Sequence, residues 1–291
     1  MGMIIDGKLV SASIKDEVKQ KVVELEQKYG SKPKLVVFYV GEDKASAIYV
    51  NNKEKACNQL GILSEVVRLS EEISEEELIK AVNEKVNDDS VNGILVQLPL
   101  PKKFDEKKIL SLIPWYKDVD GLTEKNVAKL VLNEEGLFPC TPMGVVDLMK
   151  YYNIDPCGKN VVVVGRSILV GKPLMMLLTN LNATVTLCHS RTQHLDEITR
   201  RADIIVMAIG KPRFLTQNMV NKDSIIFDVG INRLDDGKIC GDCDFDNLID
   251  NVQAITKVPG GCGPMTIAEL MKNTVKCFEI QHKDEWWIRK I

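Results

Sequence analysis

The chain has 291 residues, of which 45% are apolar and 27% are charged, and its formal net charge is −3. At roughly 150 residues per domain, this length predicts about two domains. The near balance of acidic and basic residues argues against a nucleic-acid-binding protein, which normally carries a basic surplus. No stretch reaches the roughly 18 apolar residues of a membrane span, and the first residues lack a signal-peptide pattern. We therefore expect a soluble, cytoplasmic protein with no membrane partner.

The first half of the chain alternates between two apolar periods. Apolar residues at steps of three and four predict helices, and short continuous apolar runs predict strands that are covered on both faces. Glycines at 30 and 61 can end two of the helices, and Ser74 with Glu77 has the form of a capping box that opens a third. The predicted elements are a helix over 14–29, a strand at 35–40, a helix over 45–60, a helix from 75 to 86 and a strand at 93–96.

The second half repeats this alternation more regularly. Strands are predicted at 161–164, 184–188, 204–208 and 225–229, with a helix after Gly171 and a last helix from about Pro264. Helices between short apolar strands indicate βαβ units and a parallel sheet. The fold class is therefore α/β, with two α/β domains that flank a cleft. We predict a first domain over 1–139, onto which the helix of about 264–291 packs back, and a Rossmann-like doubly wound parallel sheet over 140–263.

A nucleotide-binding turn is predicted after the first strand of the second domain. The strand runs into Gly165, Arg166 and Ser167, and Gly171 follows before an apolar helix. In this layout, backbone N–H groups and a helix N-terminus face a phosphate. The spacing departs from the dinucleotide fingerprint, because Ser167 and Val170 stand where two glycines are usual. An ordinary strand-to-helix turn remains an alternative.

The end of the next strand favours NADP over NAD. A NAD site usually places an acidic residue there to bind the ribose 2′-hydroxyl group. This chain has no acid at 186–192, and Ser190 and Arg191, helped by Arg166, can hold a 2′-phosphate through charge-assisted hydrogen bonds. A solvated turn that happens to carry an arginine is the other interpretation.

The first half contains a candidate pair for proton transfer. Tyr49 and Lys53 are four residues apart in a predicted helix, so phenol and ammonium lie on one face. An amine in this position can act in general acid–base catalysis. Taken alone, the pair is better explained as part of a solvated helix face.

Three further segments support a site. Gln97 closes a buried strand at the edge where open α/β sheets bind ligands. Asp118 and Asp120 stand beside Gly121, where one carboxylate can accept paired donors from a ring. The glycine-rich loop at 259–266 allows the backbone to approach a flat ligand closely.

Taken in order, these segments resemble the bifunctional methylenetetrahydrofolate dehydrogenase/cyclohydrolase family. The resemblance covers nearly the whole chain, and seven motifs in the same order make it specific. They are Tyr49-x-x-x-Lys53, Gln97-Leu-Pro-Leu-Pro101, Lys117-Asp-Val-Asp-Gly121, Pro139-Cys-Thr-Pro142, Gly165-Arg-Ser-x-x-Val-Gly-x-Pro173, Asp228-Val-Gly-Ile-Asn232 and Pro259-Gly-Gly-x-Gly-Pro-Met-Thr266.

The resemblance implies oxidation of 5,10-methylenetetrahydrofolate by NADP, followed by hydrolysis to 10-formyltetrahydrofolate, a step of one-carbon metabolism that serves purine biosynthesis. It also implies a homodimer. Lys53 would transfer the protons of hydrolysis, Gln97 would orient Lys53, Tyr49 would line the folate ring and Asp120 would bind the pterin. The implied substrate contacts are Tyr49, Lys53, Gln97, Leu98, Asp120, Pro259, Gly260 and Gly261. The implied nucleotide contacts are Gly165, Arg166, Ser167, Ser190 and Ile231, to which the residue pattern adds Arg191.

Two stretches depart from the family pattern. Cys262 stands where valine is usual, and we expect little effect beyond the reactivity of its thiol. Cys240 and Cys243 form a Cys-x-x-Cys pair, but no second ligand pair has the spacing of a zinc site. We therefore predict no metal, and we interpret the scattered cysteines as buried thiols.

Three other functions compete with this interpretation. Short-chain dehydrogenases also contain Tyr-x-x-x-Lys, but their nucleotide glycines precede the pair, whereas Gly165 follows Tyr49 here. A non-catalytic module with the same fold would be expected to lose Lys53, Gln97 or Asp120, which are all present. A dehydrogenase without hydrolase activity is disfavoured by the retained Lys53.

Overall fold

The structure is a computed structural model that describes residues 2–283. Its chain divides into two compact units. Unit 1 comprises Met1–Ser13 and Pro139–Glu269, and unit 2 comprises Ile14–Phe138 and Leu270–Ile291. Residues 284–291, which the sequence analysis placed in the last helix, lie outside the described residues.

The N-terminal segment differs from the predicted division of the chain. The sequence analysis placed it in the first domain, but it belongs to unit 1. The reason is a pairing across the whole sequence, because β1 (Met3–Ile5) pairs in parallel with β11 (Ala254–Thr256). Three residues are too few to show a periodic pattern, so this strand has no local signal.

Unit 1 is built on a six-stranded parallel sheet with the strand order β1-β11-β8-β7-β5-β6. The four predicted strands are confirmed to within one residue: β5 (Asn160–Val164), β6 (Thr184–Cys188), β7 (Ile204–Met207) and β8 (Ile225–Asp228). The chain leaves β5 for β6 on one side and returns to β7 on the other. This reversal is the topological switch point at which doubly wound sheets bind ligands.

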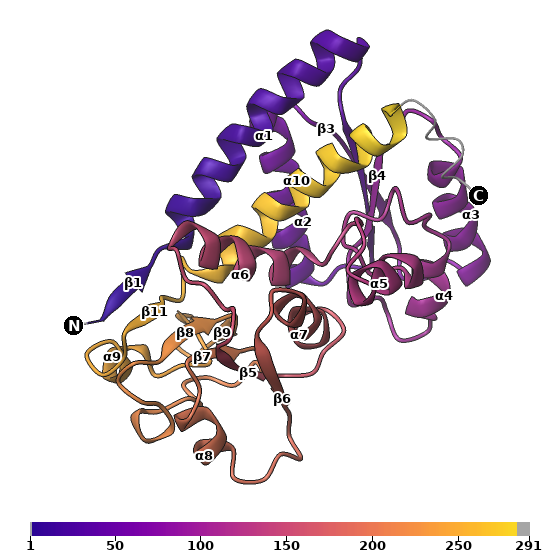
Figure 1. Ribbon diagram of the computed structural model, residues 1–291. Helices are drawn as coiled ribbons and strands as arrows, with labels where there is room; N and C mark the ends of the chain where they lie inside the picture. The colour runs from indigo at the N-terminus through magenta and orange to yellow at the C-terminus, as the bar shows by residue number, and fades with distance from the viewer. Residues whose placement is uncertain (1, 284–291) are drawn as a thin grey trace. The chain divides into compact units, whose positions relative to one another are not determined.

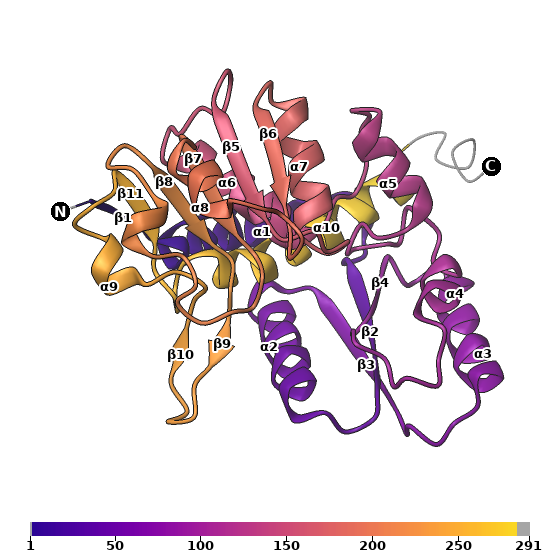
Figure 2. The ribbon, with the colours of Figure 1, turned by 90° about the horizontal axis from the view of Figure 1, so that it is seen from below.

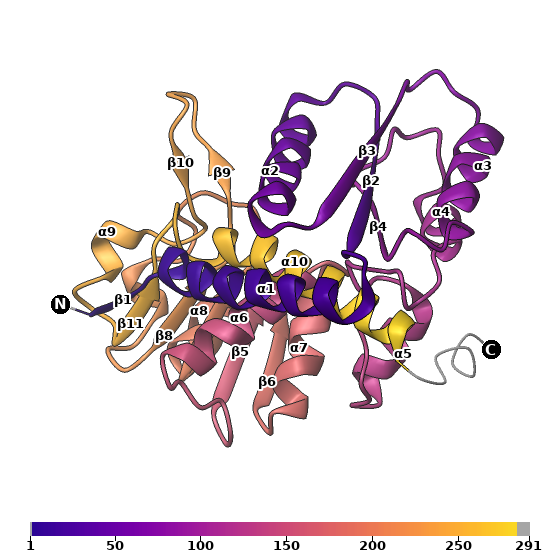
Figure 3. The same ribbon diagram turned by 90° about the horizontal axis from the view of Figure 1, so that it is seen from above.

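Helices cover both faces of this sheet. The helix α7 (Gly171–Asn180) lies against β5 and β6 (Figure 1). The other helices of unit 1 are α6 (Cys140–Tyr151), α8 (Leu195–Arg200), α9 (Phe245–Leu248), the 3-10 turn η1 (Gln217–Met219) and the first part of α10 (Cys262–His282). Two short strands, β9 (Asn232–Arg233) and β10 (Ile239–Cys240), form an antiparallel arm (Figure 3).

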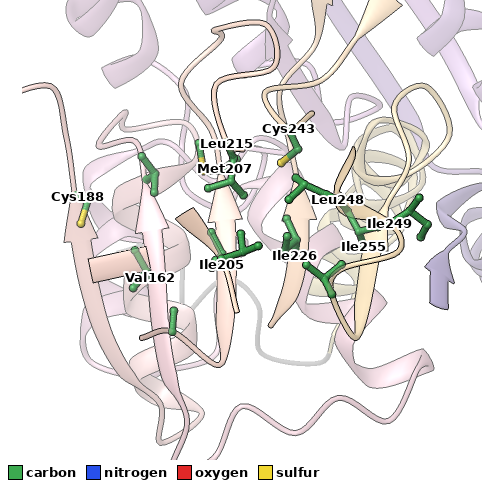
Figure 4. Packing of buried hydrophobic residues seen from close by; sticks show 14 residues of the cluster. Val162, Cys188, Ile205, Met207, Leu215, Ile226, Cys243, Leu248, Ile249 and Ile255 are labelled. Atoms are coloured by element: carbon green, nitrogen blue, oxygen red, sulfur yellow. The ribbon is translucent and has the colours of Figure 1, made fainter. Parts of the chain in front are cut away.

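The apolar strand runs explain why the sheet forms. Alternate residues such as Val162, Ile205 and Ile226 point to one face and pack there against Leu248 and other side chains (Figure 4). Residues between them, such as Val163, are also fully buried. Burial on both faces is the arrangement expected for continuous apolar strands in a parallel sheet.

Unit 2 contains a three-stranded parallel sheet with the order β3-β2-β4. Its strands are β2 (Lys34–Val40), β3 (Leu63–Leu69) and β4 (Gly93–Val96). Its helices are α1 (Gly7–Tyr29, from residue 14 onward), α2 (Lys44–Leu60), α3 (Glu75–Val86), α4 (Glu106–Ser111), α5 (Glu124–Val131) and the second part of α10. Figure 2 shows α2 on one side of this sheet and α3 with α4 on the other.

The predicted helix ends in unit 2 are confirmed by their caps. Gly30 and Gly61 follow α1 and α2 with φ values of +69° and +77°, in the left-handed region that favours glycine. Ser74 and Glu77 form the predicted capping box at the start of α3. The helix α1 begins at Gly7, seven residues before the predicted start. No helix within residues 2–283 is both long and apolar enough to cross a membrane.

Candidate active site

The helix α2 carries the first part of the candidate site. Its N-terminus is capped by Asp43, whose carboxylate accepts the N–H of Ser46 at 2.7 Å. Val50 and Cys57 are fully buried, and α2 packs against β2 and β3 of unit 2. Lys53 is half-buried, and Tyr49, one turn earlier, is 44% exposed. The amine and the phenol therefore remain accessible to a ligand.

Lys53 is hydrogen-bonded to Gln97. The ammonium Nζ donates to Oε1 of Gln97 at 2.9 Å. Gln97 directly follows β4, and its backbone N–H donates to the carbonyl of Phe38 in β2 at 2.9 Å. Its side-chain Nε2 donates to the carbonyl of Leu98 at 2.8 Å. Because both ends of the amide are engaged, Gln97 presents an oriented acceptor to Lys53.

Asp120 lies at the same edge of the sheet as Gln97. Asp118 forms an isolated parallel bridge with Ile94 of β4. Since the two segments run in the same direction, Asp120 lies two residues further toward the carboxyl edge, as Val96 does in β4. The two carboxylates differ in role. Asp118 is buried and accepts the N–H of Thr123 at 2.8 Å, whereas Asp120 is half-buried. The structure thus makes Asp118 a structural residue of the turn.

The nucleotide turn of unit 1 is shaped by two glycines. Gly165 has a φ of +126°, and a Cβ there would overlap the carbonyl oxygen of Ala208 at the end of β7. A Cβ on Gly171 would overlap the carbonyl oxygen of Gly165. The backbones at the end of β5 and the start of α7 are therefore in direct contact. Between them, Arg166 and Ser167 are exposed.

The second phosphate-binding candidate follows the neighbouring strand. Val164 of β5 pairs with Cys188 of β6, and the N–H of Gly165 donates to the carbonyl of Cys188 at 2.9 Å. Arg166 and Arg191 therefore leave adjacent strand ends, and Ser190 and Arg191 are both exposed. Close backbone approach together with two exposed guanidinium groups fits a dinucleotide that carries an additional phosphate.

The glycine-rich loop before α10 is held by the start of α1. The carbonyl of Gly260 accepts the N–H groups of Gly7 at 2.9 Å and Lys8 at 3.1 Å. A Cβ on Gly7 would overlap the carbonyl oxygen of Gly261. Pro259 is exposed at the tip of the loop, and Ile231, after β8, is 49% exposed. The sequence analysis missed this contact, because its partners are separated by about 250 positions.

Six of the eight cysteines are buried, as expected, but Cys157 is exposed and Cys240 is half-buried. All eight lie within the described residues, and none is disulfide-bonded. Burial, reinforced by the nearby Asp228 carboxylate, raises the pKa of the Cys262 thiol to about 12. The expectation of a reactive thiol at Cys262 is therefore wrong, since a thiol with this pKa stays protonated near neutral pH. Within residues 2–283, no three His, Cys, Asp or Glu side chains form a group that could hold a metal ion.

Comparisons with known proteins agree with this arrangement. The family model of the tetrahydrofolate dehydrogenase/cyclohydrolase catalytic domain matches residues 5–120, and that of the tetrahydrofolate dehydrogenase/cyclohydrolase NAD(P)-binding domain matches residues 139–282. The bifunctional protein FolD of Campylobacter hominis is 54% identical over 273 residues, which cover 94% of this chain and 96% of that protein.

Solved structures of related enzymes have the same fold. The bifunctional enzyme FolD, a methylenetetrahydrofolate dehydrogenase/cyclohydrolase from Campylobacter jejuni, superposes with a TM-score of 0.94 at 47% identity, covering 96% of this chain and 99% of that one. The methylenetetrahydrofolate dehydrogenase-cyclohydrolase of Trypanosoma brucei, complexed with NADP and an inhibitor, gives a TM-score of 0.93 at 34% identity and covers 97% and 99% of the two chains.

Proposed function

The chain belongs to the tetrahydrofolate dehydrogenase/cyclohydrolase family, and from this premise we propose how its residues carry out two consecutive reactions. The enzyme oxidises 5,10-methylenetetrahydrofolate to 5,10-methenyltetrahydrofolate with NADP. It then hydrolyses the methenyl form to 10-formyltetrahydrofolate.

The NADP site is proposed at the carboxyl edge of β5, β6 and β8. Bound NADP supplies the hydride acceptor of the first reaction. The residues that would hold it are Gly165, Arg166, Ser167, Ser190, Arg191 and Ile231. The close backbone packing at Gly165 and Gly171 and the exposed Arg166 and Arg191 support this assignment. Because hydride transfer needs no acid or base, the task of the protein in this step is to bind and orient.

The second reaction requires proton transfer, and we assign it to Lys53. Water attacks the carbon between the two nitrogens of the methenyl group and must lose a proton. Opening of the resulting ring then places a proton on the departing nitrogen. In its neutral form, Nζ of Lys53 can accept the first proton and return it in the second step. The departing ring nitrogen thereby receives a proton. The hydroxyl group of the intermediate releases its own proton to water as it becomes the formyl oxygen, and the other nitrogen keeps the formyl group.

The partners of Lys53 have positioning roles in this proposal. Gln97 accepts from Nζ at 2.9 Å and keeps the amine directed toward the carboxyl edge of β4. Tyr49, one turn earlier on α2, offers an exposed ring against which a flat pterin can pack. Asp120 would accept hydrogen bonds from the pterin, and Leu98 would border the folate on the same unit.

The observation that carries the hydrolase assignment is the oriented Lys53–Gln97 hydrogen bond. Replacing Lys53 by methionine keeps an unbranched side chain that reaches as far as Cε but removes the proton acceptor. We expect K53M to lose about 100-fold or more of its cyclohydrolase rate, as is typical for loss of a general acid–base group. Dehydrogenase activity with NADP should stay within a few-fold. Absorbance spectroscopy follows formation and decay of the methenyl compound in one cuvette.

Lys55 provides the matched control, because it is an exposed lysine on the same helix. K55M should retain both activities. Hydrolysis of the methenyl compound by K53M at the parental rate would refute the assignment of Lys53.

We further propose that the enzyme is a homodimer that acts in the cytoplasm and supplies a formyl donor for purine biosynthesis. The family resemblance supports the dimer, and the absence of disulfides among the described cysteines fits a reducing compartment. Sedimentation of the purified protein tests the dimer, and cell fractionation tests the compartment.

A further inference from the structure

The motif Asp228–Asn232 is hydrogen-bonded to a buried carboxylate, Asp242, which had not been predicted as a site residue. Asp242, at the end of the β9–β10 arm, is completely buried. Its Oδ2 accepts the N–H of Ile209 at 2.7 Å and that of Gly210 at 3.0 Å. Its Oδ1 accepts the N–H of Lys211 at 2.8 Å and Nδ2 of Asn232 at 2.9 Å. One carboxylate thus binds two loops with four hydrogen bonds.

A second buried carboxylate holds the first in place. Asp228, at the end of β8, is 2% exposed. Its Oδ1 accepts the N–H of Asp242 at 2.9 Å and that of Gly230 at 3.0 Å, and its Oδ2 accepts the N–H of Cys243 at 2.8 Å. These hydrogen bonds fix the backbone of Asp242 and Cys243. The Asp242 carboxylate is therefore held toward residues 209–211.

The glycine of the same motif makes room for this arrangement. A Cβ on Gly230 would overlap the carboxylate of Asp242. A Cβ on Gly241 would likewise overlap the carboxylate of Asp228. The two glycines and the two aspartates are therefore one packing unit, in which each glycine lies against the carboxylate of the opposite segment.

The two loops held by Asp242 lie where the NADP site is proposed. Residues 209–211 follow β7, and residues 229–232 follow β8, so both lie at the carboxyl edge of the parallel sheet. The strand β7 is the neighbour of β5 at the switch point, where Gly165 contacts the backbone of Ala208. Ile231, an expected nucleotide contact, lies between Gly230 and Asn232.

We propose that Asp242 is a positioning residue for NADP, which holds the β7 and β8 loops in the conformation that binds the cofactor. The proposal rests on the NADP site described above. Asparagine cannot replace this aspartate, because every oxygen of the carboxylate faces N–H donors. An amide at this position would direct its own N–H₂ group at donors and leave two of them without an acceptor.

The test is titration calorimetry of D242N with NADP, together with steady-state kinetics of both reactions. Loss of hydrogen bonds to a charged group predicts an NADP Kd and KM about 10- to 100-fold higher. The dehydrogenase kcat at saturating NADP should stay within about threefold. Cyclohydrolase activity, measured on the methenyl compound without NADP, should stay within about twofold, which a general loss of folding would not allow. D236N is the matched control, because Asp236 is an exposed carboxylate on the β9–β10 turn.

An NADP Kd within about twofold of the parent in a D242N protein that retains cyclohydrolase activity would overturn the proposal. If D242N loses both activities, N232A decides, because it removes one donor and leaves the carboxylate with its backbone partners. Its NADP Kd should rise about tenfold, and an unchanged value would overturn the proposal. The double variant R166A/R191A tests the proposed NADP site independently of Asp242. If this variant binds NADP as tightly as the parent, the assignment of the NADP site is wrong.

Discussion

The carboxyl edges of the two sheets differ in whether backbone or side-chain groups form the candidate site. In unit 1, the edge is made of backbone, with glycines at 165, 171 and 230 packed against carbonyl or carboxylate oxygens. In unit 2, it presents side chains, an amine on α2 and an amide after β4 joined at 2.9 Å. Binding a charged cofactor requires loops that stay fixed, whereas moving a proton requires one accessible group with an oriented partner. Adding a methyl group to a glycine should therefore weaken cofactor binding in unit 1. Removing a functional side-chain group should weaken proton transfer in unit 2.

The largest effect that would test this difference is expected from G171A. The new Cβ overlaps the carbonyl oxygen of Gly165, so the turn must shift. Overpacking of this kind costs about 1–3 kcal/mol, which corresponds to an NADP Kd up to about 100-fold higher. Calorimetric titration with NADP measures it, and cyclohydrolase activity should remain. G237A is the control for destabilisation away from the turn, because Gly237 has open space around it but a φ of +81° that strains an alanine. Parental NADP affinity in G171A would contradict the backbone-built site.

A smaller effect is expected from R191A, which changes a side chain in the unit where backbone dominates. Its guanidinium is exposed after β6 and is proposed to bind the 2′-phosphate. Loss of one charge-assisted pair predicts a fall of about tenfold in the preference for NADP over NAD. The ratio of kcat/KM for the two cofactors measures this preference, with R166A as the second variant. The assignment fails if the ratio is unchanged in both variants.

The smallest effect is expected at Glu65, a carboxylate on the surface of unit 2. Its paired lysines contrast with the buried backbone donors of Asp242. Hydrogen bonds from Lys85, and to a lesser degree from Lys34, hold the pKa of Glu65 below its usual value. E65Q should lower the free energy of unfolding by about 0.2–1 kcal/mol near neutral pH, as for other surface pairs. Because the folded pKa is the lower one, this stabilisation exists above the unfolded pKa and disappears as pH falls through the folded pKa.

Urea unfolding of E65Q and the parent over a pH series measures this difference. The two proteins should converge in acid. A difference that persists or grows in acid would show that Glu65 contributes through packing rather than through charge.

The sequence predicted the strands that contain a long enough apolar run and missed those that are mixed in composition or very short. Continuous apolar runs located β2, β4, β5, β7 and β8, because strands covered on both faces need no polar face. The edge strand β6 was also predicted, although Cys188 alone of its residues is buried. The strand β3 was missed because it lies at the edge of its sheet and mixes Ser64, Glu65 and Arg68 with apolar residues. The three-residue strands β1 and β11 depend on a partner far away in the sequence, which no local pattern can show.

The candidate site divides in the same way. The family resemblance implied that Gln97 orients Lys53, and the structure contains their hydrogen bond. The sequence could not separate Asp118 from Asp120, because only the folded turn shows that the first carboxylate is used internally. Asp242 was missed because its donors come from two loops that only the sheet brings together.

The pairing of β1 with β11 has a consequence for how the protein is made on the ribosome. Met3–Ile5 emerges first, yet its partner Ala254–Thr256 is translated more than two hundred residues later. Residues 14–138 are synthesised in the meantime. This segment of unit 2 can therefore collapse before β1 has a partner strand. Long-range closure of this kind slows folding, and β1 can pair with β11 only after β11 has been synthesised.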